Sequence, residues 1–315
     1  MGIVIGMDEA GYGPNLGPLV VAVTVWEVPG APRDTDFWGA FSNVVTQAPS
    51  NDPARLHVAD SKQVYSPARG IGPLERGVHS GLSLCGDRAT SFRALCDQLA
   101  GDSAVPLDSE PWFAGRDLDL PQVDPLAHLD ETVARWNDCC ADHGIRLKAI
   151  RSDVVLTERF NRLNREHGSK GITLSRISLA LLRSVWNPED SQPALVIADK
   201  HGGRNRYDML LAEVVDGQMI FRMEEGTHLS SYRVGATSIR FQTKAEAHLP
   251  VALASMVAKY VRELSMTLFN QFWAEHVPRL KPTKGYPVDA KRFRQDIAAV
   301  QQDLGIDDEI LWRER

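Results

Sequence analysis

Residues 2–25 read GIVIGMDEAGYGPNLGPLVVAVTV, and this stretch decides the fold. Two runs rich in β-branched residues, 2–7 and 19–25, flank a segment that contains three glycines and two prolines. Such runs favour strands, and Gly and Pro favour turns, so the stretch predicts two strands joined by a turn. The acidic pair Asp8 and Glu9 then lies at the end of the first strand, where side chains are held rigidly and face a cleft.

The rest of the chain alternates between further strands and helices. Residues 194–198, ALVIA, predict a short buried strand that ends in Asp199. Residues 156–186 predict two helices with a break near residues 168–171, where two glycines occur. Residues 249–274 predict a long amphipathic helix, which begins shortly after Glu246.

Two other regions are less regular. Residues 208–215 predict a helix, and residues 219–241 predict strands separated by turns. Residues 29–130 are rich in Pro, Gly, Asp and Ser and show weak periodicity. We expect loops and short helices there, together with a peripheral insert.

Composition places the chain among ordinary globular proteins. It has 315 residues, of which 43% are hydrophobic and 24% are charged, so neither disorder nor a fibrous repeat is indicated. The net charge of −6 argues weakly against a protein that coats nucleic acid. However, residues 276–294 carry six Lys and Arg side chains against the single acid Asp289, and such a basic stretch can hold a nucleic-acid backbone.

The cysteines and the N-terminus favour a cytoplasmic protein. Two of the four cysteines, Cys139 and Cys140, are adjacent, and no CxxC pair occurs, so we expect reduced thiols. No positively charged leader precedes the acidic pair, and the apolar run at 16–26 is too short to span a bilayer. We therefore expect no membrane association.

Carboxylates follow two predicted strands and precede one predicted helix. These are Asp8 and Glu9, then Asp199, then Glu246. A cluster of carboxylates repels itself unless a cation neutralises it, and hard divalent cations prefer oxygen ligands. Two such ions about 4 Å apart could activate a water and stabilise the leaving oxygen of a phosphodiester. Periodicity alone does not show that these acids converge, since an isolated Asp at a strand end is usually a turn or cap residue.

Residues 8–22, DEAGYGPNLGPLVVA, resemble the ribonuclease HII signature, which has the form DEAGRGPxxGPxVVA. Further blocks follow in the order of that family, and several resemble its archaeal and eukaryotic branch. They are ADSK at 59–62, FNRLN at 160–164 with LSRISLALLRSV at 174–185, ADKHGGRNRYDMLL at 198–211, KAEAHLPVALASMVAKYVREL at 244–264 and KGYPVDAKRF at 284–293. Together they cover most of the chain outside residues 63–150.

The resemblance implies an α/β chain with a ribonuclease H-like fold: a mixed central sheet flanked by helices, with insertions and a helical C-terminal region. It implies a catalytic domain over residues 1–275, with a divergent insert at about 63–150 and inserted strands at about 216–242. Residues 276–315 would form a C-terminal helical extension that binds substrate. The expected protein is a monomer, although accessory subunits exist for some members of the family.

The implied activity is hydrolysis of RNA paired with DNA, or of a single ribonucleotide within duplex DNA. It would leave 3′-hydroxyl and 5′-phosphate ends and would need two Mg²⁺ or Mn²⁺ ions. By resemblance, Asp8, Glu9, Asp199 and Glu246 are both the catalytic and the metal-binding residues. The implied substrate-binding residues are Gly11, Tyr12, Gly13, Lys62, Lys284 and Tyr286, with Tyr286 reading the 2′-hydroxyl.

Three positions depart from the family pattern. Glu246 stands where the family has Asp, so its carboxylate reaches one methylene farther. A bland alternative is that Glu246 caps the long helix. Tyr12 stands where the family has an Arg that contacts phosphate, and Tyr12 either stacks on substrate or packs against its own loop. The long separation between Asp199 and Glu246 implies inserted strands, whose GTHLSS segment either touches substrate or forms a plain hairpin.

Other interpretations remain open. His201 and His248 flank the acidic positions and could move protons, although a neighbour in sequence more often points elsewhere. The chain could be a nuclease with shifted specificity for duplex RNA or structured DNA, or a binding relative with impaired catalysis. A nucleotide-binding loop is disfavoured, because no GKS or GKT follows Gly17.

Overall fold

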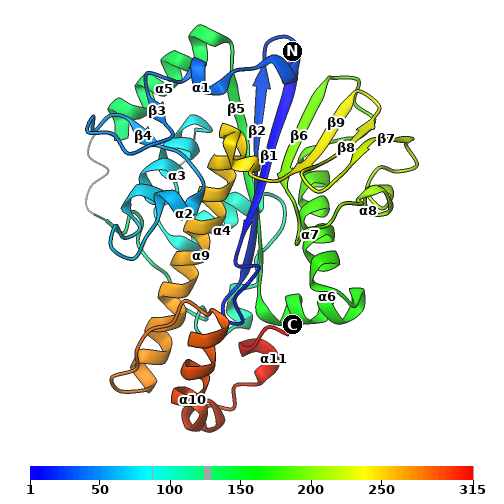
Figure 1. Cartoon of the computed structure of the whole chain (residues 1–315). Coiled ribbons are helices and arrows are strands. Elements are labelled where there is room, and N and C mark those ends of the chain that lie inside the picture. The colour runs from blue at the N-terminus through cyan, green and yellow to red at the C-terminus, as the bar shows by residue number, and fades with distance from the viewer. Residues whose placement is uncertain (87, 124–128, 315) are drawn as a thin grey trace.

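The computed structural model describes residues 1–86, 88–123 and 129–314 (Figure 1). The predicted insert at 63–150 therefore includes residue 87 and residues 124–128, which lie outside the described residues. None of the helices within the described ranges is long and apolar enough to cross a membrane.

A seven-stranded mixed sheet forms the centre of the molecule. Its order is β5 (Arg146–Val155), β2 (Leu19–Val28), β1 (Gly2–Ala10), β6 (Ala194–Asp199), β9 (Thr237–Gln242), β8 (Leu229–Val234) and β7 (Ile220–Glu225). β1 pairs with β2 in antiparallel fashion and with β6 in parallel fashion. The hairpin of β1 and β2 and the strand ending in Asp199 agree with the sequence prediction, as do the strands within 219–241.

Helices cover both faces of this sheet (Figure 1). One face packs against α9 (Leu249–His276), α3 (Gly72–Leu84) and α4 (Phe92–Ala100). The other face packs against α6 (Thr157–His167), α7 (Lys170–Val185) and α8 (Asp208–Ala212). The expected mixed sheet flanked by helices is therefore confirmed.

The remaining elements are short or peripheral to the sheet. They are η1 (Pro32–Asp34), α1 (Phe37–Ala40), β3 (Val45–Thr46), β4 (Leu56–His57), α2 (Ser61–Val64), η2 (Leu107–Ser109), α5 (Leu129–His143), η3 (Ala245–Ala247), α10 (Pro287–Asp303) and α11 (Asp308–Leu311). β3 and β4 pair with each other in a separate two-stranded sheet.

The break between α6 and α7 has a local cause. Gly168 adopts a φ of 65° and ends α6 in the left-handed region, which glycine occupies without steric cost. The backbone N–H of Gly168 donates to the carbonyl of Asn164, which closes the last turn. The predicted break is confirmed here, but Gly171 lies inside the first turn of α7.

The structure departs from the sequence analysis in three places. The region around α3 and α4 is less peripheral than expected, because Leu74, Val78 and Leu95 belong to the main core, whereas its description as an insert stays a prediction. α9 is not simply amphipathic: almost all of its first twenty-one residues are buried, since α3 and the C-terminal segment pack on sides that a surface helix would expose. Strand β5, at one edge of the sheet, had no prediction.

The C-terminal helices share the main core. Phe293 of α10 lies with its ring centroid 5.6 Å from that of Phe269 in α9, and Leu311 of α11 is fully buried. A role of residues 276–315 in binding substrate stays a prediction.

Close packing of α9 on β1 makes Gly6 sensitive to substitution. A Cβ at Gly6 would lie 2.2 Å from the carbonyl carbon of Pro250, so backbone would have to move. We expect Gly6→Ala to lower the free energy of unfolding by about 1–3 kcal/mol, measured by urea unfolding. Gly72→Ala is the matched control, because its added Cβ would meet Val123 at an ordinary 3.7 Å. Equal effects of the two substitutions would contradict this account.

Candidate active site

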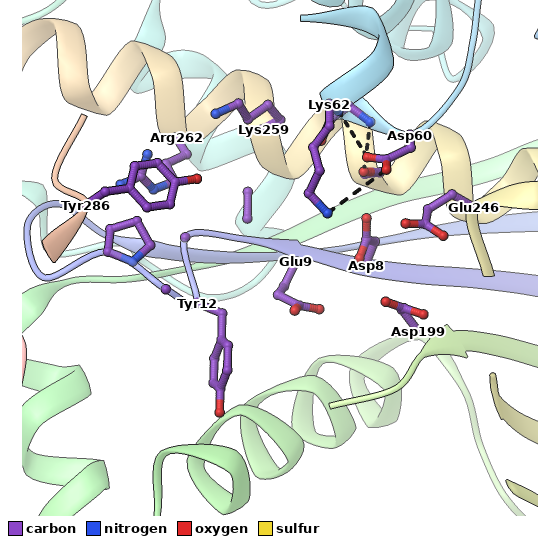
Figure 2. Close-up of a pocket in the computed structure, with 16 residues that line it drawn as sticks. Asp8, Glu9, Tyr12, Asp60, Lys62, Asp199, Glu246, Lys259, Arg262 and Tyr286 are labelled. Carbon is purple, nitrogen blue, oxygen red and sulfur yellow. Dashed lines mark hydrogen bonds and ion pairs between the residues drawn. The ribbon is translucent and has the colours of Figure 1, made fainter. Parts of the chain in front are cut away.

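A cavity of about 260 Å³ opens where β1 and β6 end beside α9 (Figure 2). Its lining comes from β1, the glycine loop after it, α2, β6, η3, α9 and the start of α10. The lining residues are Asp8, Glu9, Ala10, Gly11, Tyr12, Gly13, Pro14, Asp60, Ser61, Lys62, Asp199, Glu246, Ser255, Lys259, Arg262 and Tyr286. Of the residues predicted to act at the site, all except Lys284 line this one cavity.

The sheet explains why carboxylates that are far apart in the sequence line the same cavity. β1 and β6 are parallel, and Met7 pairs with Ala198, so Asp8 and Asp199 lie next to each other where the two strands end. β9 is parallel to β6 and pairs Gln242 with Asp199, so the chain leaves β9 at the same edge. The turn η3 that follows then carries Glu246 into the cavity.

Burial and mutual repulsion disfavour charge on the β1 acids. The pKa of Asp8 is raised well above its usual value, first by burial and then by Glu9, although a hydrogen bond with Ser255 opposes the rise. The pKa of Glu9 is raised to about 7, first by burial and then by Asp199, whereas Lys62 opposes the rise. Buried carboxylates of this kind need a compensating positive charge.

The other two carboxylates, Asp199 and Glu246, also have raised pKa values. Burial is the first cause of a raised pKa for both Asp199 and Glu246, and the charge of Asp199 raises that of Glu246 further. Oδ1 of Asp199 is buried without a hydrogen-bond partner among the described residues. The N-cap of α9 is His248, which makes no side-chain capping bond, so Glu246 lies in η3 and is not the helix cap.

The donor set suits a hard divalent cation, because every candidate ligand is a carboxylate oxygen and one of these oxygens, Oδ1 of Asp199, has no hydrogen-bond partner in the described part of the chain. The four carboxylates share the cavity without converging, however. Over residues 1–86, 88–123 and 129–314, no three His, Cys, Asp or Glu side chains stand in an arrangement that would hold a metal ion. Ligation would therefore require side-chain rotation, which the long Glu9 and Glu246 side chains allow.

A basic wall faces these acids. Lys62, Lys259 and Arg262 line the same cavity, and Nζ of Lys62 lies 4.0 Å from Oδ2 of Asp60 (Figure 2). A cavity with carboxylates on one side and cations on the other matches a phosphodiester backbone, whose phosphates would lie along the basic wall while the reacting bond lies near the acids.

Sequence reasoning missed seven lining residues. They are Ala10, Pro14, Asp60, Ser61, Ser255, Lys259 and Arg262. Asp60 belongs to the ADSK block, in which the resemblance implies a role for Lys62 only. Ser255, Lys259 and Arg262 are spaced four and three residues apart, which places them on one face of α9. That spacing was a usable signal, but the apolar character of the helix favoured an interpretation as core.

The glycine loop is held from behind by two buried arginines. Gly11 adopts a φ of 93°, and a Cβ there would lie 2.6 Å from Nε of Arg262, so glycine is required. Arg313 is fully buried and donates hydrogen bonds to the carbonyls of Gly11 and Pro14. These contacts hold the loop in a fixed position at the edge of the cavity.

Tyr12 points away from the basic wall (Figure 2). Its hydroxyl lies 3.1 Å from where a Cβ of Gly202 would be, and Nζ of Lys170 lies 5.2 Å from its ring centroid. Burial and then the charge of Glu9 raise its pKa. The ring thus packs between the start of α7 and the loop after β6, which agrees with packing rather than with a guanidinium-like phosphate contact.

Tyr286 and Lys284 lie close together in the chain but are placed differently. Tyr286 lines the cavity and is 52% exposed, so its ring is accessible to a ligand. Lys284 lies outside the lining and forms an ion pair with the buried Glu263. Its roles, like those of the other predicted site residues, stay predictions.

The two histidines flanking the acids face elsewhere. His201 is buried against Tyr207 and Phe241, and its ring Nδ1 lies 3.0 Å from the hydroxyl of Ser175. Burial lowers its pKa to about 3, so its ring stays neutral. His248 lines a different cavity, on the side of η3 where Trp38 lies.

The GTHLSS segment forms the turn between β7 and β8 and does not line the cavity. Lys200 ties it to the loop after β6, because its Nζ donates to the carbonyl of Gly226 and to the hydroxyl of Ser230. The segment is therefore a hairpin that supports the neighbourhood of Asp199.

No protein-family model and no curated protein matches the chain. Among solved structures, it is similar to ribonuclease H2 from Pyrococcus horikoshii OT3, at 16% identity and a TM-score of 0.44, covering 98% of this chain and 92% of that one. A chain of the PCNA:RNase HII complex from Archaeoglobus fulgidus has 14% identity and a TM-score of 0.41, with 99% and 94% covered. Bst-RNase HIII in complex with Mn²⁺ has 16% identity and a TM-score of 0.41, with 99% and 65% covered. At these values the chemistry must be argued from the cavity itself.

The raised pKa of Glu9 predicts how stability depends on pH without divalent metal. Its folded-state pKa is about 7 and its usual value is 4.5, so the native state binds the proton more tightly. The free energy of unfolding should therefore rise as pH falls from about 7 to about 4.5. We expect Glu9→Gln to flatten this dependence, measured by urea unfolding in EDTA. The pKa of Glu110 is also raised to about 7, and it makes the same contribution to the pH dependence of the wild-type protein and of the variant. If Glu9→Gln leaves the pH dependence of the free energy of unfolding unchanged, the raised pKa does not belong to Glu9.

Proposed function

We propose that this chain is a metal-dependent endoribonuclease of the ribonuclease HII kind. Its substrate would be the RNA strand of an RNA/DNA hybrid or a ribonucleotide embedded in duplex DNA, cut to leave 3′-hydroxyl and 5′-phosphate ends. The observation that carries the proposal is the gathering of Asp8, Glu9, Asp199 and Glu246 from three separate elements in one cavity with a basic wall. The ordered blocks that resemble ribonuclease HII support the same reading.

The metal ligands would be the four carboxylates Asp8, Glu9, Asp199 and Glu246. They would hold two ions, either Mg²⁺ or Mn²⁺. When bound, such ions lower the pKa of a water and stabilise the leaving oxygen of a phosphodiester. The protein's own contribution is to hold the four carboxylates at one edge of a rigid sheet. Burial raises the pKa of all four carboxylates, and repulsion from neighbouring acids raises each pKa further, which favours the binding of a cation.

The rest of the cavity would orient the nucleic acid. Gly11 and Gly13 leave room for the backbone amides of the loop to approach a ribose or phosphate. Lys62 would contact a phosphate. The half-exposed ring of Tyr286 would pack on a sugar next to the 2′-hydroxyl, which is the group that distinguishes RNA from DNA.

The position of Tyr12 favours a second candidate function. A guanidinium there would supply a bidentate phosphate contact, whereas the Tyr12 ring packs toward Gly202 and Lys170. This loss favours a nuclease of the same chemistry with altered specificity, for duplex RNA or structured DNA.

The deciding experiment uses end-labelled duplexes: an RNA/DNA hybrid, DNA with one ribonucleotide, RNA/RNA and DNA/DNA, each in Mg²⁺, Mn²⁺ or EDTA. We expect metal-dependent cutting of the ribonucleotide-containing DNA duplexes. Asp199→Asn should lower the rate by about a hundredfold or more, because a ligand of the charge-stabilising site is lost. Asp138→Asn, at an exposed carboxylate on α5, is the matched control and should leave the rate unchanged.

Each alternative has its own outcome in this assay. Cutting of RNA/RNA or DNA/DNA alone would replace the substrate assignment with the second candidate function. Binding of duplexes without cutting in any metal would refute the enzyme and indicate a nucleic-acid-binding relative.

A further inference from the structure

A buried carboxylate next to the cavity binds two cations and one tyrosine hydroxyl, which come from three segments of the chain. Glu263 of α9 has a side chain that is 4% exposed. Its Oε1 lies 2.6 Å from Nζ of Lys259, and its Oε2 accepts hydrogen bonds from Nζ of Lys284 and, at 2.8 Å, from the hydroxyl of Tyr65. Nζ of Lys284 in turn donates to the hydroxyl of Tyr65 at 2.8 Å. These four residues form the Glu263 cluster.

The Glu263 cluster carries surplus positive charge and spare donors. Two ammonium groups share one carboxylate, and the positive charges of Lys259 and Lys284 hold the pKa of Glu263 at about 2 despite its burial. A lysine has three N–H donors. Within the described residues, Lys284 uses two of them and Lys259 uses one. Both ammonium groups also lie over the ring of Tyr65: Nζ of Lys259 is 4.9 Å from the ring centroid, and Nζ of Lys284 is 5.3 Å from it.

The Glu263 cluster is fixed relative to the candidate active site. Lys259 lines the cavity, one helical turn beyond Ser255, which bonds to Asp8. That turn advances about 6 Å along the helix axis, which corresponds to one or two nucleotides of a duplex strand. Lys284 precedes Gly285, whose carbonyl accepts the backbone N–H of Asn15 at 2.7 Å, so the cluster is tied to the glycine loop.

We propose that Lys259, Lys284 and Tyr65, organised by Glu263, form a second phosphate-binding subsite for the nucleic-acid strand. It would hold a backbone phosphate one or two nucleotides away from the phosphodiester at the carboxylates. This subsite rests on the proposed function and specifies how that function holds its substrate. The resemblance implies a substrate contact for Lys284 alone, and the Glu263 cluster adds Lys259 and Tyr65 to it.

Glu263 acts in this subsite as a positioning residue. Without it, two flexible lysine side chains would repel each other and would lose conformational freedom when a phosphate binds. With it, their ammonium groups are already oriented, and the net charge of the three groups remains positive. The phosphate then meets donors that need little rearrangement.

The test measures how salt affects binding, without catalysis. A fluorescent DNA duplex with one ribonucleotide is titrated in EDTA between about 50 and 200 mM salt, and the slope of log affinity against log salt is determined by anisotropy. Lys259→Met and Lys284→Met should each make the slope shallower by about 0.9, the value for one lost phosphate contact. Lys148→Met is the matched control. Lys148 lies on the edge strand β5, away from the cavity, and pairs with Glu27 of β2, so its loss should not change the slope.

A second readout separates binding from chemistry. In the metal-loaded enzyme, Lys284→Met should raise KM severalfold and leave kcat within about twofold. The reason is that the lost contact binds the substrate and the transition state equally. Thermal melting of each variant verifies the fold, and Glu263 keeps one lysine partner in either variant.

The outcomes separate the subsite from the proposed function. Wild-type slopes in both lysine variants, with normal binding by the wild-type protein, would overturn the subsite. Binding without any cutting would overturn the nuclease while the slopes still decide the subsite. A wild-type protein that binds no duplex would overturn both.

Discussion

The packing of α9 along β1 is the constraint on which the rest of the structure depends. The helix runs alongside the strand and then alongside the loop that follows it, with contacts at successive levels. These contacts join Gly6 to Pro250 and Asp8 to Ser255 in the strand, and Gly11 to Arg262 and Gly17 to Met266 in the loop. Three of the four levels are at glycines, where the missing Cβ allows close approach. The same contact places the acids of β1 opposite the cations of α9, so the cavity is a direct product of this packing.

The cavity has two halves of opposite charge, and each half stabilises the other. Burial raises the pKa of Asp8 and Glu9, while Lys62 partly offsets the effect for Glu9. Charges buried in this way are costly unless they are paired with other charges or with ions. Under the proposed function, a phosphodiester with divalent cations would compensate the charges of both halves together. The Glu263 cluster extends the basic half along α9.

Several errors of sequence reasoning have one physical cause, which is that long-range contacts leave little local pattern. Residues around α3 have weak periodicity, yet Leu74 and Val78 are buried because α9 lies against them. β5 is half-exposed at the sheet edge, so its apolar alternation is diluted by arginine and aspartate. Arg313 gives no signal in sequence, although it is fully buried and holds the glycine loop.

The sequence by itself determined the local elements and the chemistry available to them. The β-branched runs specify β1 and β2, the glycines specify the turn and the break after α6, and the acids stand in fixed register at the strand ends. These features depend on neighbouring residues, so periodicity and residue type suffice to predict them. The tertiary structure alone decided that Asp199 and Glu246 line one cavity with Asp8, that Lys259 and Arg262 form the opposite wall, and that Lys284 pairs with Glu263. Those outcomes depend on how β1, β6 and α9 pack. Packing brings together residues that are far apart in the chain, and no periodic pattern in the sequence indicates which residues these are.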